Sequence, residues 1–98
     1  MLSIVIPTYN EEQRIEKTLL DYYKYFLKKE RFEIIVVCDG VDKTAKIVRT
    51  LMKNRKGIRI VEFSHKLGKG GAILEGFKIA KYPLVGFTYA DESVSPED

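Results

Sequence analysis

Three glycines enclose a lysine in the segment Gly68-Lys69-Gly70-Gly71, which leads into an apolar stretch with helical spacing. Glycines at a helix start let backbone amides approach a ligand closely, and the lysine adds a charge that suits phosphate. The segment is not a P-loop, because the GxxxxGK[ST] spacing is absent, and it is not GxGxxG, because position 73 is isoleucine. It is a candidate phosphate-side segment, and the alternative is a turn that only begins a helix.

Two aspartates come soon after apolar runs, Asp39 after residues 34–37 and Asp91 after residues 84–88. A carboxylate in such a place can accept hydrogen bonds from a base or ribose, or hold a divalent cation between diphosphate oxygens. Each could equally be an exposed turn or cap residue. Glu11 has the same two interpretations, since a helix start also favours an acidic residue.

The usual nucleophiles and bases are sparse in this sequence. His65 is the single histidine, and the local sequence fixes no carboxylate, serine or cysteine partner for it, so a role in loop packing or beside a phosphate is favoured over catalysis. Cys38 follows four residues of buried type and is interpreted as a small core residue. No Cys/His cluster has zinc-site spacing. We therefore assign no catalytic residue.

Four apolar runs alternate with three stretches of helical spacing. We expect strands at residues 2–6, 34–37, 58–63 and 84–88, and helices at 11–29, from Asp42 through 52, and at 70–80. In the last helix, Gly76 and Phe77 are expected to face inward. Continuous apolar strands separated by helices of about ten or more residues predict an α/β fold with a parallel sheet covered on both faces.

Polar residues or glycines follow every expected strand. The four segments are Pro7-Thr8-Tyr9-Asn10-Glu11, Cys38-Asp39-Gly40, Ser64-His65-Lys66 with the glycines after it, and Tyr89-Ala90-Asp91-Glu92. Ligands of open parallel sheets bind beyond the carboxyl ends of the strands. The sequence therefore predicts one binding edge, assembled from all four segments.

Length and charge narrow the class of protein. Ninety-eight residues, 45% of them hydrophobic, suffice for one domain with one core. The net charge of +3 does not indicate nucleic-acid binding, because the basic residues are scattered and several, such as Lys28 and Lys29, fall at expected helix ends. The alternative for those lysines is peripheral contact with acidic lipid headgroups. One cysteine favours a reducing compartment, and we expect a cytoplasmic location, at the membrane face if that contact exists.

Four motifs in order resemble family-2 glycosyltransferases. Residues 4–12, IVIPTYNEE, are similar to the opening motif of the family, and the NEE ending resembles the dolichyl-phosphate mannose and glucose synthase branch. Residues 33–44, EIIVVCDGVDKT, are similar to EIIVVDDGSxDxT. Residues 65–76 resemble the N-x-G-K-G-x-A-x-x-x-G segment, and residues 87–98 resemble the segment around the DxD metal motif. The resemblance covers essentially the whole chain.

The resemblance implies the N-terminal, nucleotide-binding half of a GT-A fold, with about four strands in the order 3-2-1-4. It implies a site that binds a nucleoside diphosphate sugar of the UDP-glucose or GDP-mannose type, with Mg or Mn as cofactor. The residues that it places beside the nucleotide are Pro7, Tyr9, Glu11, Asp39, Gly68, Lys69, Gly70, Gly71 and Ala90, and the residue that it places on the cation is Asp91.

The sequence departs from the family pattern at several of these positions. Cys38 replaces the first aspartate of DDGS, Tyr89 stands where the first aspartate of DxD is expected, and His65 stands near the asparagine of the third motif. Tyr89 removes a carboxylate from the expected cation site. The motif around Asp39 is also about one residue shorter near Val41.

The resemblance implies inverting transfer of a sugar to dolichyl or polyprenyl phosphate as the reaction of the parent enzyme. We expect the chain to be a truncated domain that does not turn over alone, because no acceptor half follows Asp98. Two alternatives stay open: a non-catalytic nucleotide-binding module or pseudoenzyme, and a family-2 transferase with a glycan or protein acceptor. A flavodoxin-like receiver domain is disfavoured, because no acidic pair closes the first strand.

Overall fold

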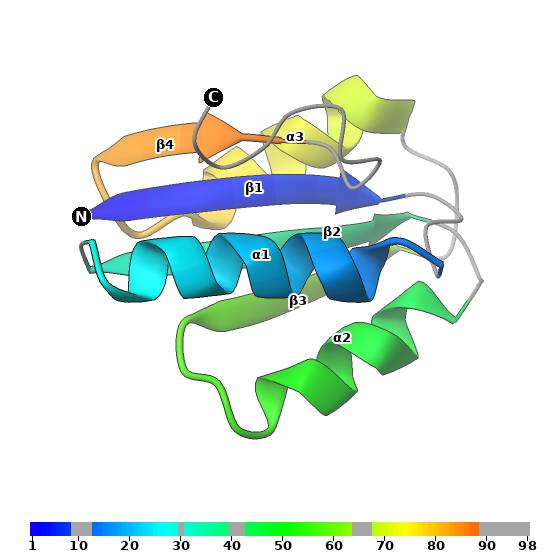
Figure 1. Cartoon of the computed structure of the whole chain (residues 1–98). Coiled ribbons are helices and arrows are strands. Elements are labelled where there is room, and N and C mark those ends of the chain that lie inside the picture. The colour runs from blue at the N-terminus through cyan, green and yellow to red at the C-terminus, as the bar shows by residue number, and fades with distance from the viewer. Residues whose placement is uncertain (9–12, 30, 40–42, 64–67, 89–98) are drawn as a thin grey trace.

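The fold is a four-stranded parallel sheet covered by three helices, seen in a computed structural model that describes residues 1–8, 13–29, 31–39, 43–63 and 68–88 (Figure 1). The elements in chain order are β1 (Leu2–Thr8), α1 (Ile15–Leu27), β2 (Phe32–Asp39), α2 (Thr44–Met52), β3 (Ile58–Phe63), α3 (Gly68–Ile79) and β4 (Leu84–Phe87). The sheet order is β3-β2-β1-β4, with every pair parallel. The predicted fold class and strand order are confirmed.

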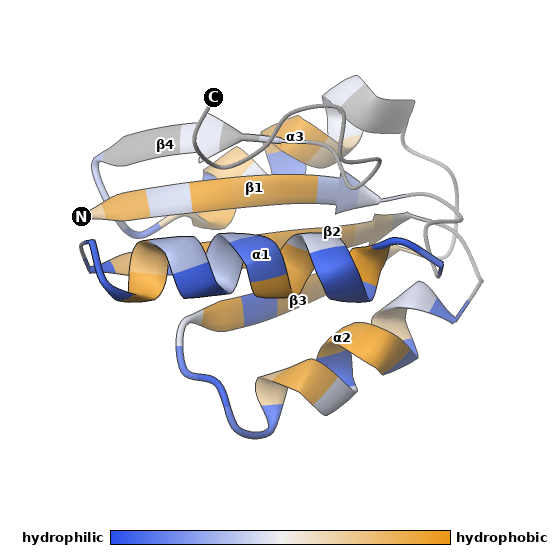
Figure 2. Cartoon of the chain, viewed as in Figure 1, coloured by the Kyte–Doolittle hydropathy of each residue, from blue (hydrophilic) through white to orange (hydrophobic). Residues whose placement is uncertain are grey.

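Alternate residues of the two central strands belong to two separate hydrophobic cores, one on each face of the sheet. Ile4 and Ile6 face α1 and α2, whereas Val5 between them faces α3. The same alternation in β2 places Ile34 and Val36 on the first face and Ile35 and Val37 on the second. Figure 2 shows the result, with hydrophobic colour along both strands and mixed colour on α1 and α2. Burial on both faces explains why these strands read as unbroken apolar runs.

Helix α3 approaches the sheet closely because its inner surface is made of small residues. Ala72 is buried, and a Cβ at Gly76 would overlap the side chain of Val5. With Ala72 and Gly76 against the sheet, Phe77 lies about 100° further round the helix and is 38% exposed. The prediction that Phe77 faces inward is therefore wrong, whereas the prediction for Gly76 is confirmed.

The amino ends of the strands are tied together by a buried carboxylate. Glu33 is 1% exposed and accepts hydrogen bonds from the Ser3 hydroxyl (2.6 Å), the Lys81 backbone N–H (2.7 Å) and the Arg59 guanidinium (3.0 Å). Burial by itself raises the pKa of Glu33, but the bonds from Lys81, Ser3 and Arg59, and the Arg59 charge, outweigh it and hold that pKa below the ordinary value of 4.5. Glu33 thus joins β1, β2, β3 and the α3–β4 turn.

No helix in the described part of the chain combines the length and the apolar character needed to cross a membrane.

Candidate functional site: the carboxyl edge of the sheet

The carboxyl ends of the parallel strands and the amino ends of the helices lie at one edge of the molecule (Figure 1). Register pairs Thr8 of β1 with Cys38 of β2, and the next residue, Asp39, pairs with Phe63 at the end of β3. Each helix follows a strand and runs back along the sheet, so its amino end faces this edge. Helix amino ends carry partial positive charge and free N–H groups, which suit an anionic ligand such as a diphosphate.

Strand β1 reaches this edge in a fixed conformation. Thr8 is buried, and its hydroxyl donates a hydrogen bond of 3.1 Å to the Val37 carbonyl of β2. Pro7 is also buried and belongs to the strand, which extends two residues beyond the predicted end at Ile6. The last β1–β4 pair joins Val5 to Phe87, so the N–H that Pro7 lacks would fall where pairing with β4 ends.

A second buried threonine, Thr88, directly follows strand β4. The Thr88 backbone N–H donates to the Val5 carbonyl (3.0 Å), and the Thr88 hydroxyl forms a hydrogen bond of 2.9 Å with the Tyr22 hydroxyl of α1. Because Tyr22 and Thr88 are 66 residues apart, no local pattern could have found this contact.

The predicted glycine segment occupies the first turn of α3. This helix begins at Gly68 rather than at residue 70, so the glycines are helical and do not form a loop before the helix. Gly70 is exposed, and a Cβ built there would meet nothing within 4 Å. Glycines in a first helical turn suit phosphate recognition, because no side chain blocks the approach to the backbone amides.

Of the other predicted site residues, Asp39 is the last residue of β2, and its backbone lies at the carboxyl edge. Four more lie outside the described residues: Tyr9, Glu11, Ala90 and Asp91. They follow the ends of β1 and β4 in the sequence. Among described residues, no group of three or more His, Cys, Asp or Glu side chains could hold a metal ion.

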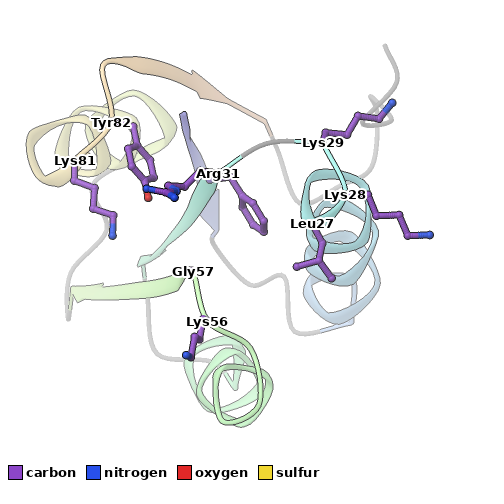
Figure 3. Close-up of a pocket in the computed structure, with 9 residues that line it drawn as sticks. Leu27, Lys28, Lys29, Arg31, Lys56, Gly57, Lys81 and Tyr82 are labelled. Carbon is purple, nitrogen blue, oxygen red and sulfur yellow. The ribbon is translucent and has the colours of Figure 1, made fainter.

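A basic pocket of about 620 Å³ lies at the opposite, amino edge of the sheet (Figure 3). Its described lining comes from the end of α1, the starts of β2 and β3, and the α3–β4 turn: Leu27, Lys28, Lys29, Arg31, Phe32, Lys56, Gly57, Lys81 and Tyr82. Five of these nine residues are cationic and none is acidic. The pocket carries none of the residues predicted to contact the nucleotide.

Comparison with known protein families decides the class. The family model described as glycosyl transferase family 2 matches residues 3–98. The chain belongs to glycosyl transferase family 2. The predicted resemblance is thereby confirmed.

The chain is similar in sequence to a glucosyltransferase and to a polysaccharide synthase. Dolichyl-phosphate beta-glucosyltransferase of Saccharomyces cerevisiae is 40% identical over 84 residues, which are 78% of this chain and 25% of that protein. Poly-beta-1,6-N-acetyl-D-glucosamine synthase of Staphylococcus aureus is 33% identical over 97 residues, 98% of this chain and 23% of that protein. The chain thus spans about a quarter of the length of these relatives.

Two solved structures share the fold closely. The mannosyltransferase PcManGT of Pyrobaculum calidifontis, in complex with GDP-Man and Mn²⁺, aligns with a TM-score of 0.83 and 28% identity over 92% of this chain and 27% of that protein. Residues 1–349 of TarS of S. aureus, in complex with UDP-GlcNAc, align with a TM-score of 0.82 and 27% identity over 98% of this chain and 28% of that chain. The GT-A fold predicted from the motifs is confirmed.

Proposed function

We propose that the carboxyl edge binds a nucleoside diphosphate sugar and that the chain forms the donor-binding part of a glycosyltransferase. The observation that carries the proposal is the convergence of strand ends and helix amino ends at one edge of the sheet, in a chain that belongs to this family. Binding of GDP-Man by PcManGT and of UDP-GlcNAc by TarS supports this ligand class.

We further propose dolichyl or polyprenyl phosphate as the acceptor, with inversion at the transferred sugar. The support is the similarity to dolichyl-phosphate beta-glucosyltransferase together with the NEE ending of the first motif. The similarity to poly-beta-1,6-N-acetyl-D-glucosamine synthase favours a glycan acceptor as the second candidate. The two are separated by supplying UDP-glucose with dolichyl phosphate or with an oligosaccharide to a protein that includes this chain. Transfer to the lipid is expected, and transfer to the oligosaccharide alone would contradict it.

We also propose a divalent cation, Mg or Mn, in the bound complex. Its support is the Mn²⁺ in the PcManGT complex and the match of Asp91 to the second acid of DxD. Such a cation neutralises charge on a diphosphate leaving group. Because Tyr89 supplies no carboxylate, we expect Mn²⁺ to raise UDP or GDP affinity only weakly and Tyr89→Asp to strengthen that effect. Strong Mn²⁺ coupling in the native chain that Tyr89→Asp leaves unchanged would contradict this account of Tyr89.

Calorimetric titration of UDP and GDP tests the binding proposal at Asp39. Asp39→Ala is expected to weaken binding by about 1 to 3 kcal/mol, the usual size of a lost charge-assisted hydrogen bond. The control is Asp21→Ala, which removes an exposed carboxylate that pairs with Lys17 on α1. It is expected to leave affinity unchanged. Equal affinity in the native chain and Asp39→Ala would show that Asp39 is only a turn residue.

A further inference from the structure

We propose that Tyr22 is a positioning residue for the nucleotide edge, acting through its hydroxyl on Thr88. This inference rests on the proposed function, because Thr88 directly precedes the Tyr89-Ala90-Asp91 segment that the function requires. Tyr22 lies on α1, which no motif of the binding edge includes. Its effect is therefore indirect, through the place where β4 ends.

Two elements hold Thr88 independently. Strand β1 holds its main chain, since the Thr88 N–H donates to the Val5 carbonyl at 3.0 Å. Helix α1 holds its side chain, since the hydroxyls of Thr88 and Tyr22 are 2.9 Å apart. Both side chains are buried, so the bond is shielded from competing water. Thr88 is therefore held through both its main chain and its side chain.

The hydroxyl of Tyr22 is separable from the packing of its ring. The ring packs in the α1 core and stacks near Phe26, with centroids 6.3 Å apart. A phenylalanine would fill nearly the same space, so Tyr22→Phe removes the hydroxyl and keeps the packing of the ring. A buried phenol oxygen needs a hydrogen-bond partner, and Thr88 supplies one. The oxygen thus contributes the link from α1 to the end of β4.

Strand β4 depends on such a link more than β1 does. β1 is a central strand of seven residues, paired on both sides, and Thr8 fixes its end to Val37. β4 has four residues and, within the described sheet, pairs with β1 alone. Fewer ladder bonds hold a short edge strand, so side-chain anchoring contributes more to the position of its last residue.

The experiment measures UDP and GDP dissociation constants by calorimetry for Tyr22→Phe, Thr88→Val and Thr88→Ser, at a temperature where circular dichroism shows each variant folded. Tyr22→Phe and Thr88→Val are each expected to raise the dissociation constant about fivefold, the factor of one typical hydrogen bond. The double variant should lose no more than either single one, since both remove the same bond. Thr88→Ser keeps the hydroxyl, so its dissociation constants should equal those of the native chain.

Tyr25→Phe is the matched control. It removes one phenol from the same helix, where the Tyr25 ring lies near Lys29 at the amino edge of the sheet, and should leave affinity unchanged. If the native chain binds nucleotide and Tyr22→Phe binds it within about twofold, with only the melting temperature lowered, Tyr22 has a structural role alone and the inference is overturned. If the native chain binds neither UDP nor GDP, the proposed function fails and this inference fails with it.

Discussion

Glu33→Gln should destabilise the fold, although it replaces only one carboxylate oxygen by an NH₂ group. Glu33 Oε2 accepts from both the Ser3 hydroxyl and the Lys81 N–H, and Oε1 accepts from Arg59. Glutamine can keep its carbonyl at the Oε2 position only by turning its NH₂ group toward the Arg59 guanidinium. Two donors then face each other, and a charge-assisted bond is lost while the other two become neutral.

The expected loss is about 2 kcal/mol in the free energy of unfolding. A hydrogen bond to a charged group contributes about 1.5 to 3 kcal/mol, and the Arg59 side chain is 42% exposed, so water recovers part of its loss. For a domain of this size, about 2 kcal/mol lowers the melting temperature by roughly 10 °C. Urea unfolding followed by circular dichroism at pH 7 measures the difference directly.

The pH dependence of that difference is a second readout. Because the folded pKa of Glu33 is lowered, its ionised form stabilises the fold fully above the unfolded pKa. That contribution falls as pH drops below 4.5 and through the lower folded pKa. Glu33→Gln lacks the group, so the native and variant stabilities should converge in acid. A loss below about 0.5 kcal/mol at pH 7, or a gap that widens in acid, would refute the reasoning.

Glu62→Gln is the matched control for this prediction. It makes the same chemical change in the salt bridge between Glu62 and Arg49, where both side chains are exposed. Exposed pairs contribute about 0 to 1 kcal/mol, so this variant should unfold close to the native chain.

Two further predictions follow from particular contacts. Gly76→Ala should lower the free energy of unfolding by about 1 to 3 kcal/mol, because the new Cβ would overlap Val5. Gly70→Ala places its Cβ in open space on a helix, so it should raise that free energy by up to about 1 kcal/mol. Equal effects in urea unfolding would contradict the close α3–β1 contact. Replacing Lys28 and Lys29 together by Gln reduces the charge of the amino-edge pocket and should leave UDP and GDP affinity unchanged in calorimetry; a tenfold loss would place nucleotide there instead.

The sequence was sufficient to predict the architecture because its signals are strong and agree. Apolar runs rich in β-branched residues alternate with helical spacing, and that pattern permits few arrangements besides a parallel sheet covered on both faces. The meeting of the strands' carboxyl ends at one edge was also predictable, since it follows from parallel pairing. The order of the strands came from family resemblance rather than from the pattern.

Other features depend on contacts between distant residues, which a single sequence does not encode locally. Phe77 reads as inward by spacing alone, but the small side of α3 at Gly76 sets the actual rotation of the helix. From the sequence, Glu33 is only a charged residue near the start of a strand. Its burial is possible because Ser3, Arg59 and Lys81 donate hydrogen bonds to its carboxylate. The bond from Tyr22 to Thr88 has the same origin.

The most direct test of the account is to locate the bound nucleotide on the folded chain. Amide chemical shifts are recorded by ¹⁵N NMR while UDP or GDP is added to the native chain. The account predicts that the largest shifts fall at the carboxyl edge, at Thr8, Asp39, Thr88 and the first turn of α3 from Gly68 to Gly71. Shifts confined to the pocket at the amino edge, around Arg31, Gly57 and Lys81, would contradict it.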